Sequence, residues 1–250
     1  MTWGSFSIAH IVSLILAVGI IAALYFVLRK ANNTVKIAVL GVLSFSGIAA
    51  IIFNLVTWNS PWEYLPFHLC SINAMVLPFA VFSRNKILNN LLLLWSLGAL
   101  IALVINNAVA ETEILGWTFV FYYFPHVLEF GIPILMFLLK LVKKDVKCLG
   151  TTLGITMASY TLIHFINLWV NSHAAANNIT TPAGEVVKVN YMYSLGPDGL
   201  PILTQLYQLV PFEYWYMYLV AVVIAVYLVI VYLPEIIKLI KNKKKAGICV

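Results

Sequence analysis

The sequence FSIAHIVSLILAVGIIAALYFVLRK, residues 6–30, contains no Asp, Glu, Lys or Arg until its final pair, Arg29 and Lys30. The hydrocarbon core of a bilayer is ~30 Å thick, and a helix needs about 20 apolar residues to cross it. Residues 6–28 are therefore predicted to form a transmembrane helix. The run is too long for the apolar part of a secretory signal and no basic segment precedes it, so we expect no cleaved leader.

Six further apolar runs follow, and the composition agrees with them. Hydrophobic residues make up 62% of the 250 residues and charged residues only 10%, against about 25% charged residues in soluble domains. We predict an all-α, polytopic membrane protein, a seven-transmembrane-helix bundle over residues 1–240. A long outer loop at about 171–211 is expected to cap the bundle, and 241–250 to form a basic cytoplasmic tail. The predicted spans are about 6–28, 37–57, 66–83, 87–107, 117–142, 148–170 and 212–234.

The basic residues predict the orientation. All but Lys188 of the 15 Lys and Arg residues fall on one side of the predicted spans. That side is cytoplasmic by the positive-inside rule, which places the N-terminus outside and the C-terminus in the cytoplasm. The net charge of +6 does not indicate a nucleic-acid partner, because the basic residues form short clusters between apolar runs, without an aromatic-interleaved basic patch.

Polar residues gather on the predicted outer side. All five histidines lie in the outer half of the membrane or beyond it, and Cys70, His126 and His164 fall at roughly one depth. Ionisable groups inside a membrane are costly and are commonly functional. Such side chains can also serve only to hydrogen-bond across helices, and a free cysteine can be a small core residue. For the group as a whole we favour a functional site.

The third predicted helix places Cys70 near its amino end. Pro66 suits the first helical position, which leaves the N–H groups of Phe67, His68 and Leu69 without acceptors inside the helix. The positive end of the helix dipole stabilises a thiolate, and unpaired amides can hold an oxyanion. Cys70 is thus a candidate nucleophile. We expect it to be a free thiol because it is separated across the membrane from the other two cysteines.

Cys148 and Cys249 are predicted to lie together at the cytoplasmic face. A disulfide between them is geometrically possible but is disfavoured by a reducing cytoplasm. We expect both to be free thiols.

His126 is the best placed base. Glu129 follows it at i+3 and can orient or charge the imidazole, so Cys70, His126 and Glu129 have the logic of a nucleophile, a base and an orienting group. The same pair with His68 or His164 is only a weak metal-binding pattern, and no H-E-x-x-H or H-x-x-E-H spacing is present. No phosphate-binding loop or dinucleotide fingerprint is present either. We expect no metal and no cofactor.

Four short motifs, in order along the chain, carry a family resemblance. They are LPFHLC (65–70), FPH (124–126), NYMY (190–193) and PFEYWY (211–216). Together they resemble the YwaF-like bacterial integral membrane proteins. That family is similar to the transmembrane-protein-164-like acyltransferases and, more distantly, to the androgen-induced membrane hydrolases.

The resemblance implies transfer of an acyl chain between glycerophospholipids without acyl-CoA, or a related acyl hydrolysis. Cys70 would be the nucleophile and His126 the general base. The protein would be a multi-pass protein of a bacterial cell membrane. Phospholipids would be the substrates, and no protein partner is implied. Glu129 belongs to the site by the spacing argument. The other candidates for supporting or lipid-contacting roles are His68, His164, Asn167, Asn190 and Tyr191.

A different class of function is also compatible with the sequence. Seven helices with the N-terminus outside are the topology of receptors, so the chain can be a non-enzymatic receptor or a protein that binds lipids or small molecules. Fold analogy alone is a poor argument for function. A transporter is less compatible, because titratable residues are nearly absent from the predicted inner halves of the spans.

Overall fold

The computed structural model describes residues 2–106 and 109–245, which are almost entirely helices and loops. In these residues the only strand-like pairing is two isolated bridges, Thr2 with Glu113 and Thr180 with Val186. The all-α prediction is therefore confirmed. The chain divides into two compact units, Met1–Lys143 and Lys144–Val250.

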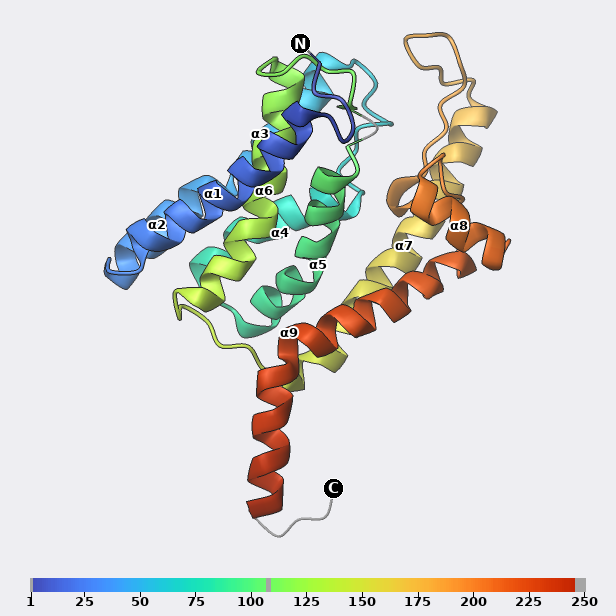
Figure 1. The fold of residues 1–250 in the computed structure, drawn as a ribbon. Coiled ribbons are helices and arrows are strands. Elements are labelled where there is room, and N and C mark those ends of the chain that lie inside the picture. The colour runs from blue at the N-terminus through green and yellow to red at the C-terminus, as the bar shows by residue number, and fades with distance from the viewer. Residues whose placement is uncertain (1, 107–108, 246–250) are drawn as a thin grey trace. The chain divides into compact units, whose positions relative to one another are not determined.

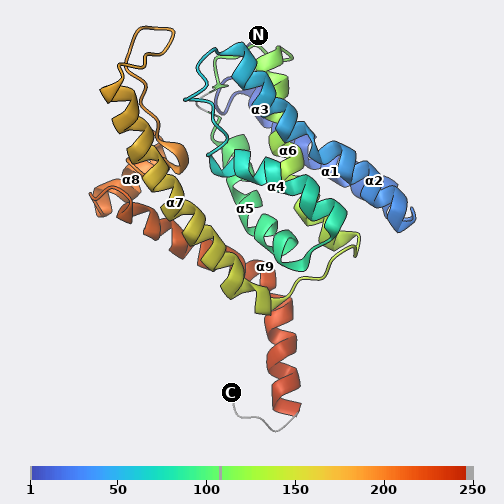
Figure 2. The same cartoon turned by 180° about the vertical axis from the view of Figure 1, so that it is seen from behind.

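The first unit is built around one central helix (Figures 1 and 2). That helix, α6, packs against α1, α2, α3, α4 and α5, and α4 also packs against α2, α3 and α5. A helix surrounded on several sides must be apolar over most of its surface, and α6 is. The bounds are α1 Ile8–Leu28, α2 Asn33–Ser44, α3 Ser46–Thr57, α4 Leu69–Ser83, α5 Lys86–Val104 and α6 Trp117–Leu138.

The second unit pairs two long helices with a structured connection. The long helices α7 and α9 are joined by a segment that contains a short helix, α8, and two single 3-10 turns. The predicted outer loop is thus largely ordered, and α7 continues six residues past its predicted end at 170. The bounds are 3-10 Val146–Cys148, α7 Leu149–Ala176, 3-10 Tyr191–Tyr193, α8 Pro201–Leu209, 3-10 Trp215–Met217 and α9 Tyr218–Lys245.

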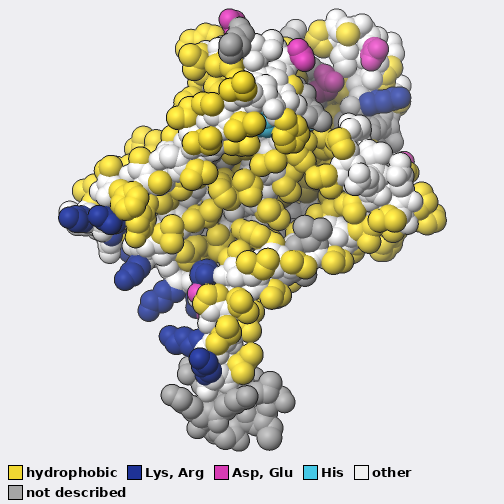
Figure 3. All heavy atoms as spheres, in the orientation of Figure 1, with side chains coloured by type: hydrophobic (Ala, Val, Ile, Leu, Met, Phe, Trp, Pro, Cys, Tyr) yellow, Lys and Arg dark blue, Asp and Glu magenta, His cyan; other side chains and the backbone are white. Residues whose placement is uncertain are grey.

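Several helices are long and apolar enough to cross a membrane, which makes the chain a multi-pass membrane protein. Among the described residues these are Ile8–Leu28, Asn33–Thr57, Lys86–Val104, Trp117–Leu138 and Val146–Ala176. The apolar α4 is shorter. Hydrophobic side chains cover the outside of α1, and Arg29 and Lys30 are exposed beyond its end, as expected for a helix in lipid (Figure 3).

Several predicted helices differ from the structure at their boundaries. The fifth ends at Leu138 rather than at 142, and the last begins at Tyr218 rather than at 212. The second predicted run is interrupted at Phe45, whose N–H donates to the carbonyl of Val42 rather than of Gly41. The hydroxyl of Ser44 donates to the Gly41 carbonyl instead, at 2.6 Å. The third predicted run begins at Leu69 rather than at Pro66, because the N–H of Phe67 donates to Leu65 in a tight turn before the helix.

The N-terminal segment folds back into the first unit. Trp3 is fully buried among Ala17, Leu103, Phe119 and Tyr123, and its indole N–H donates to Ser13 at 3.0 Å. Its backbone N–H donates to the carbonyl of Thr112. The segment therefore packs against α1, α5 and α6 together, at one end of these helices.

His10 is held by two backbone groups in the same region. Its Nδ1 accepts the N–H of Phe6 at 2.9 Å, so Nε2 carries the proton and donates to the carbonyl of Leu103 at 2.8 Å. Both ring nitrogens of this fully buried imidazole are thus used in packing α1 against α5.

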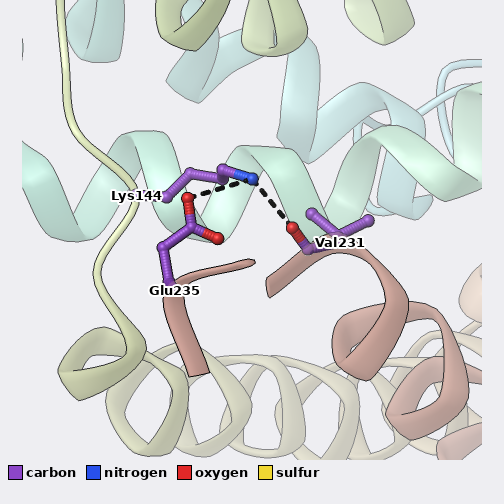
Figure 4. Close-up of polar contacts among 3 residues, drawn as sticks. All are labelled: Lys144, Val231 and Glu235. Carbon is purple, nitrogen blue, oxygen red and sulfur yellow. Dashed lines mark hydrogen bonds and ion pairs between the residues drawn. The ribbon is translucent and has the colours of Figure 1, made fainter. Parts of the chain in front are cut away.

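In the second unit a lysine contacts α9 beside the proline within that helix. Pro234 has no N–H and leaves the carbonyl of Ile230 without its helical donor. Close to that position the ammonium group of Lys144 donates to the carbonyl of Val231 at 2.8 Å and pairs with Glu235 at 3.3 Å (Figure 4). Residues 241–245 of the predicted tail continue α9, while 246–250, with Cys249, lie outside the described residues.

The close packing around Gly47 leads to a prediction about stability. A Cβ at this position of α3 would lie 2.5 Å from the Cβ of Ala74 and 2.7 Å from Oε1 of Glu129. Gly47→Ala should therefore lower the free energy of unfolding by about 1–3 kcal/mol through overpacking. Thermal unfolding of the purified protein in detergent measures it.

Gly19→Ala is the matched control. No atom lies within 4 Å of a Cβ at Gly19 in α1, so the substitution should be neutral or stabilising by up to about 1 kcal/mol. Equal unfolding temperatures for the two variants would contradict the packing at Gly47.

Candidate functional site

Cys70 is the second residue of α4, and hydrogen-bond donors of the first helical turn lie beside its sulfur. The first bond of this helix runs from the N–H of Ile72 to the carbonyl of His68, so the N–H groups of Leu69, Cys70 and Ser71 have no acceptor within the helix. The thiol lies beside the backbone amides of Cys70 and Ser71 and the hydroxyl of Ser71. Donors at a helix N-terminus favour a thiolate and can stabilise an oxyanion.

The Glu129 carboxyl group, if charged, disfavours a thiolate at Cys70 and so opposes the effect of the donors. Glu129, on α6, lies close enough to Cys70 to interact with it electrostatically, and a negative charge there disfavours a thiolate. Glu129 is only 3% exposed. A charged Glu129 would therefore oppose the effect of the helix N-terminal donors on Cys70.

Asn73, one turn after Cys70, faces the same carboxyl group. It is 0% exposed, and its amide lies near the Glu129 side chain. No hydrogen bond of ordinary length and angle joins them: both polar atoms of Asn73 and Oε2 of Glu129 are buried without a partner among the described residues. The hydroxyl of Ser46, at the start of α3, is buried in the same condition.

His126 has a defined tautomer. Its Nδ1 lies 2.7 Å from the backbone carbonyl of Tyr122, and because a carbonyl only accepts, Nδ1 carries the proton. Nε2 is then the basic nitrogen of the neutral ring. The Tyr122 ring packs on the imidazole with centroids 4.3 Å apart, and its hydroxyl donates to Ala102 of α5. His126 is thus oriented from α5 and from its own helix.

Cys70, Glu129 and His126 all belong to the first unit but differ in how directly they are connected. Cys70 and Glu129 interact, and His126 lies one turn before Glu129 on α6. The described structure contains no hydrogen bond between the Cys70 sulfur and the His126 ring. His68 is the residue that caps the start of α4, without a side-chain bond to the helix amides.

The remaining candidates lie in the second unit, where they form hydrogen bonds to or within the segment that connects α7 and α8. Asn167 of α7 accepts the N–H of Tyr191 at 3.0 Å and donates to its carbonyl at 2.8 Å and to the Ser194 hydroxyl at 2.9 Å. His164 contacts the same hydroxyl through Nδ1 at 3.1 Å. Asn190 closes the loop by bonding the backbone of Leu195 and Gly196. These polar groups are engaged in positioning residues 190–196.

Sequence reasoning missed several residues that shape these sites. Asn73 could have been found from its position one turn after Cys70 on the same face of the helix. Tyr122 precedes His126 by four residues, but its use of a backbone carbonyl has no signature in the sequence. Ser46 and Ser194 give no signal at all, because serine is common in such loops and helix starts.

The described residues contain no cluster of side chains typical of a transition-metal site. No group of three or more His, Cys, Asp or Glu side chains gathers there. Cys70 and Cys148 are free thiols, as their positions led us to expect.

The Asn167 contacts predict a loss of order in the connecting segment. Asn167→Ala removes two hydrogen bonds to the Tyr191 backbone and should cost about 1–3 kcal/mol of stability. Proteolysis within residues 189–196 should become faster at temperatures well below global unfolding. Asn177→Ala, which removes only exposed contacts to His173, should change neither quantity. An unchanged cleavage rate in Asn167→Ala would contradict this role.

Comparison with known proteins places the chain in a family. The TMEM164 family model matches residues 5–233, which covers both units and every candidate residue. Searches of curated proteins and of solved structures gave no significant match. With a match over this much of its length, the chain is a member of the TMEM164 family.

Proposed function

We propose that the protein is a membrane-embedded acyltransferase that moves fatty acyl chains between glycerophospholipids through a thioester on Cys70. The observation that carries the proposal is the position of the Cys70 sulfur at the start of α4, beside the backbone amides of Cys70 and Ser71, which have no acceptors within the helix. Membership of the TMEM164 family and the resemblance to acyl-CoA-independent acyltransferases support the choice of chemistry.

The first half-reaction forms the thioester. The Cys70 thiol gives its proton to Nε2 of His126 as the sulfur attacks the ester carbonyl of a donor phospholipid. The resulting oxyanion is stabilised by the free amides of the first turn of α4. The bond between the carbonyl carbon and the glycerol oxygen then breaks, and His126 returns the proton to the departing lysophospholipid.

The second half-reaction regenerates the thiol. The hydroxyl of an acceptor lysophospholipid gives its proton to Nε2 of His126 and attacks the thioester carbonyl. The carbon–sulfur bond breaks, Cys70 recovers the proton, and no net oxidant, reductant or nucleotide is consumed. Water as the acceptor would release a fatty acid instead, which is the related hydrolase reaction.

The proposal includes a membrane arrangement. We place the chain in a bacterial cell membrane as a YwaF-like protein with seven spans, the N-terminus outside and the site in the outer half. Donor and acceptor lipids then reach Cys70 laterally from one leaflet. In this arrangement His68 and the second-unit residues His164, Asn167, Asn190 and Tyr191 lie on the headgroup side.

Removal of the nucleophile is the first test. Reconstituted wild-type protein with a labelled phospholipid donor and a lysophospholipid acceptor should transfer label and carry a hydroxylamine-sensitive acyl adduct on Cys70, detected by peptide mass spectrometry. Cys70→Ala should lose both, down to the rate without protein. Cys148→Ala, a change at a buried free thiol of the second unit, should keep both. Transfer by Cys70→Ala at the wild-type rate would refute the assignment.

Removal of the base is the second test. His126→Gln should lower the rate of thioester formation by roughly 10²–10⁴-fold, as for loss of a general base, while the protein remains folded. His173→Ala, in the second unit, is the histidine control and should retain the wild-type rate. A receptor or passive lipid binder would instead show no acyl adduct in any variant, although it would still bind phospholipid.

A further inference from the structure

The His126 ring needs one tautomer and one orientation to act as a base, because only an unprotonated ring nitrogen can accept a proton. The 2.7 Å bond from Nδ1 to the Tyr122 carbonyl selects the tautomer that leaves Nε2 basic. One hydrogen bond does not fix the plane of the ring, since the imidazole can still turn about its side-chain bonds. Another contact of His126 must therefore hold that plane.

The Tyr122 side chain supplies this second contact. Its ring packs against the imidazole with centroids 4.3 Å apart and planes inclined by 32°. Residues four apart lie on the same face of a helix, so Tyr122 reaches His126 from the preceding turn of α6. The same residue thus contacts His126 twice, through its backbone carbonyl and through its ring. Displacement of the Tyr122 ring would leave the imidazole free to turn.

The Tyr122 hydroxyl is bound to the end of α5. It donates to the carbonyl of Ala102 at 2.9 Å. Ala102 lies in the last turn of that helix, where carbonyls have no N–H donor within the helix, and a polar group in hydrocarbon must find its partner inside the protein. The neighbouring carbonyl of Leu103 is paired in the same way by His10. The bond therefore satisfies α5 and also anchors the tip of the Tyr122 side chain.

The N-terminal segment holds the edge of the Tyr122 ring. The indole of Trp3 meets this ring edge-on, with centroids 5.9 Å apart and planes inclined by 70°. Trp3 is itself fixed, because it is fully buried and donates from its indole to Ser13 and from its backbone to the carbonyl of Thr112. A chain of contacts therefore runs from Trp3 through Tyr122 to His126.

We propose that Tyr122 is the positioning residue of His126 and that Trp3 supports it, so that the N-terminal segment controls the orientation of the base. The proposal rests on the proposed function for the role of His126 as a base. The orientation of the ring does not, because the tautomer of His126 is measured on the resting protein without lipid. Contacts that only packed α1, α5 and α6 together would leave this tautomer unchanged when one of them is removed.

The test is nitrogen-15 NMR of the full chain in detergent micelles with labelled histidine, at alkaline pH where the imidazole is neutral. Protonated and unprotonated ring nitrogens resonate at different frequencies, and the signals that disappear in His126→Gln belong to His126. Wild type should show Nδ1 protonated and Nε2 unprotonated. Tyr122→Phe, which removes only the hydroxyl, should lower the ratio of this tautomer to the Nε2–H form about fivefold, the effect of losing one hydrogen bond.

Tyr123→Phe is the matched control. The Tyr123 hydroxyl also donates to a buried backbone carbonyl, that of Ser13 at 2.6 Å, and its ring also lies near Trp3. The bond lost in this variant is similar in kind but joins α6 to α1, so the wild-type tautomer ratio should be kept. Equal ratios in wild type and both variants, or an equal fall in both variants, would overturn the proposal.

The support by Trp3 is tested by a double substitution. Trp3→Leu should lower the tautomer ratio in the same direction as Tyr122→Phe. In a Tyr122→Leu background it should add nothing to the change in this ratio, because its effect passes through Tyr122. A further fall in that background, or an unchanged ratio in Trp3→Leu alone, would refute the support by Trp3.

Kinetics then connect the ring orientation to the reaction. In acyl-transfer assays Tyr122→Phe should lower kcat about tenfold with KM unchanged, as expected for a misaligned base. Tyr123→Phe should retain the wild-type kcat. Absence of transfer by the wild type would refute the proposed function, whereas the tautomer ratios would still decide whether Tyr122 orients the His126 ring. A wild-type kcat in a Tyr122→Phe protein whose tautomer ratio has fallen would overturn the positioning role.

Discussion

Hydrocarbon offers no hydrogen bonds, and this constraint shapes every part of the first unit. A backbone or side-chain polar group placed there must find its partner inside the protein. Most groups do so locally: Ser44 takes the carbonyl left at the Phe45 break, and His10 satisfies two backbone groups at once. The places where the rule fails, at Asn73, Glu129 and Ser46, are therefore few and are all close to the candidate nucleophile or to Gly47.

The two buried histidines of the first unit show how the same side chain serves different ends. His10 and His126 are both held by backbone groups, but through opposite tautomers. In His10 both nitrogens are consumed between α1 and α5, so the ring is a structural link. In His126 the described residues give a hydrogen-bond partner to Nδ1 alone, and Nε2 would be the base in the proposed reaction. Position in the sequence cannot distinguish these cases; the partner of each nitrogen does.

Much of the helical architecture was predictable because span length and apolar composition follow directly from bilayer thickness. The all-α class and the multi-pass membrane character are accordingly confirmed. The break at Phe45 was not predicted, although Ser46 and Gly47, which follow it, are residue types at which helices commonly kink. The start of α4 was misplaced because Pro66 suits a first helical turn, yet its neighbours form a tight turn instead. The proximity of Glu129 to Cys70 depends on how α4 and α6 pack, which no local spacing encodes.

The Trp3 segment has a consequence for the order of events during synthesis. Trp3 completes its contacts only with Thr112, Phe119 and Tyr123, more than a hundred residues later in the chain. At translation rates of about 5–20 residues per second, these partners emerge roughly 5–20 s after the segment itself. The Trp3 segment therefore cannot make these contacts until α6 has been synthesised. It reaches its final contacts only when α1, α5 and α6 are all in place.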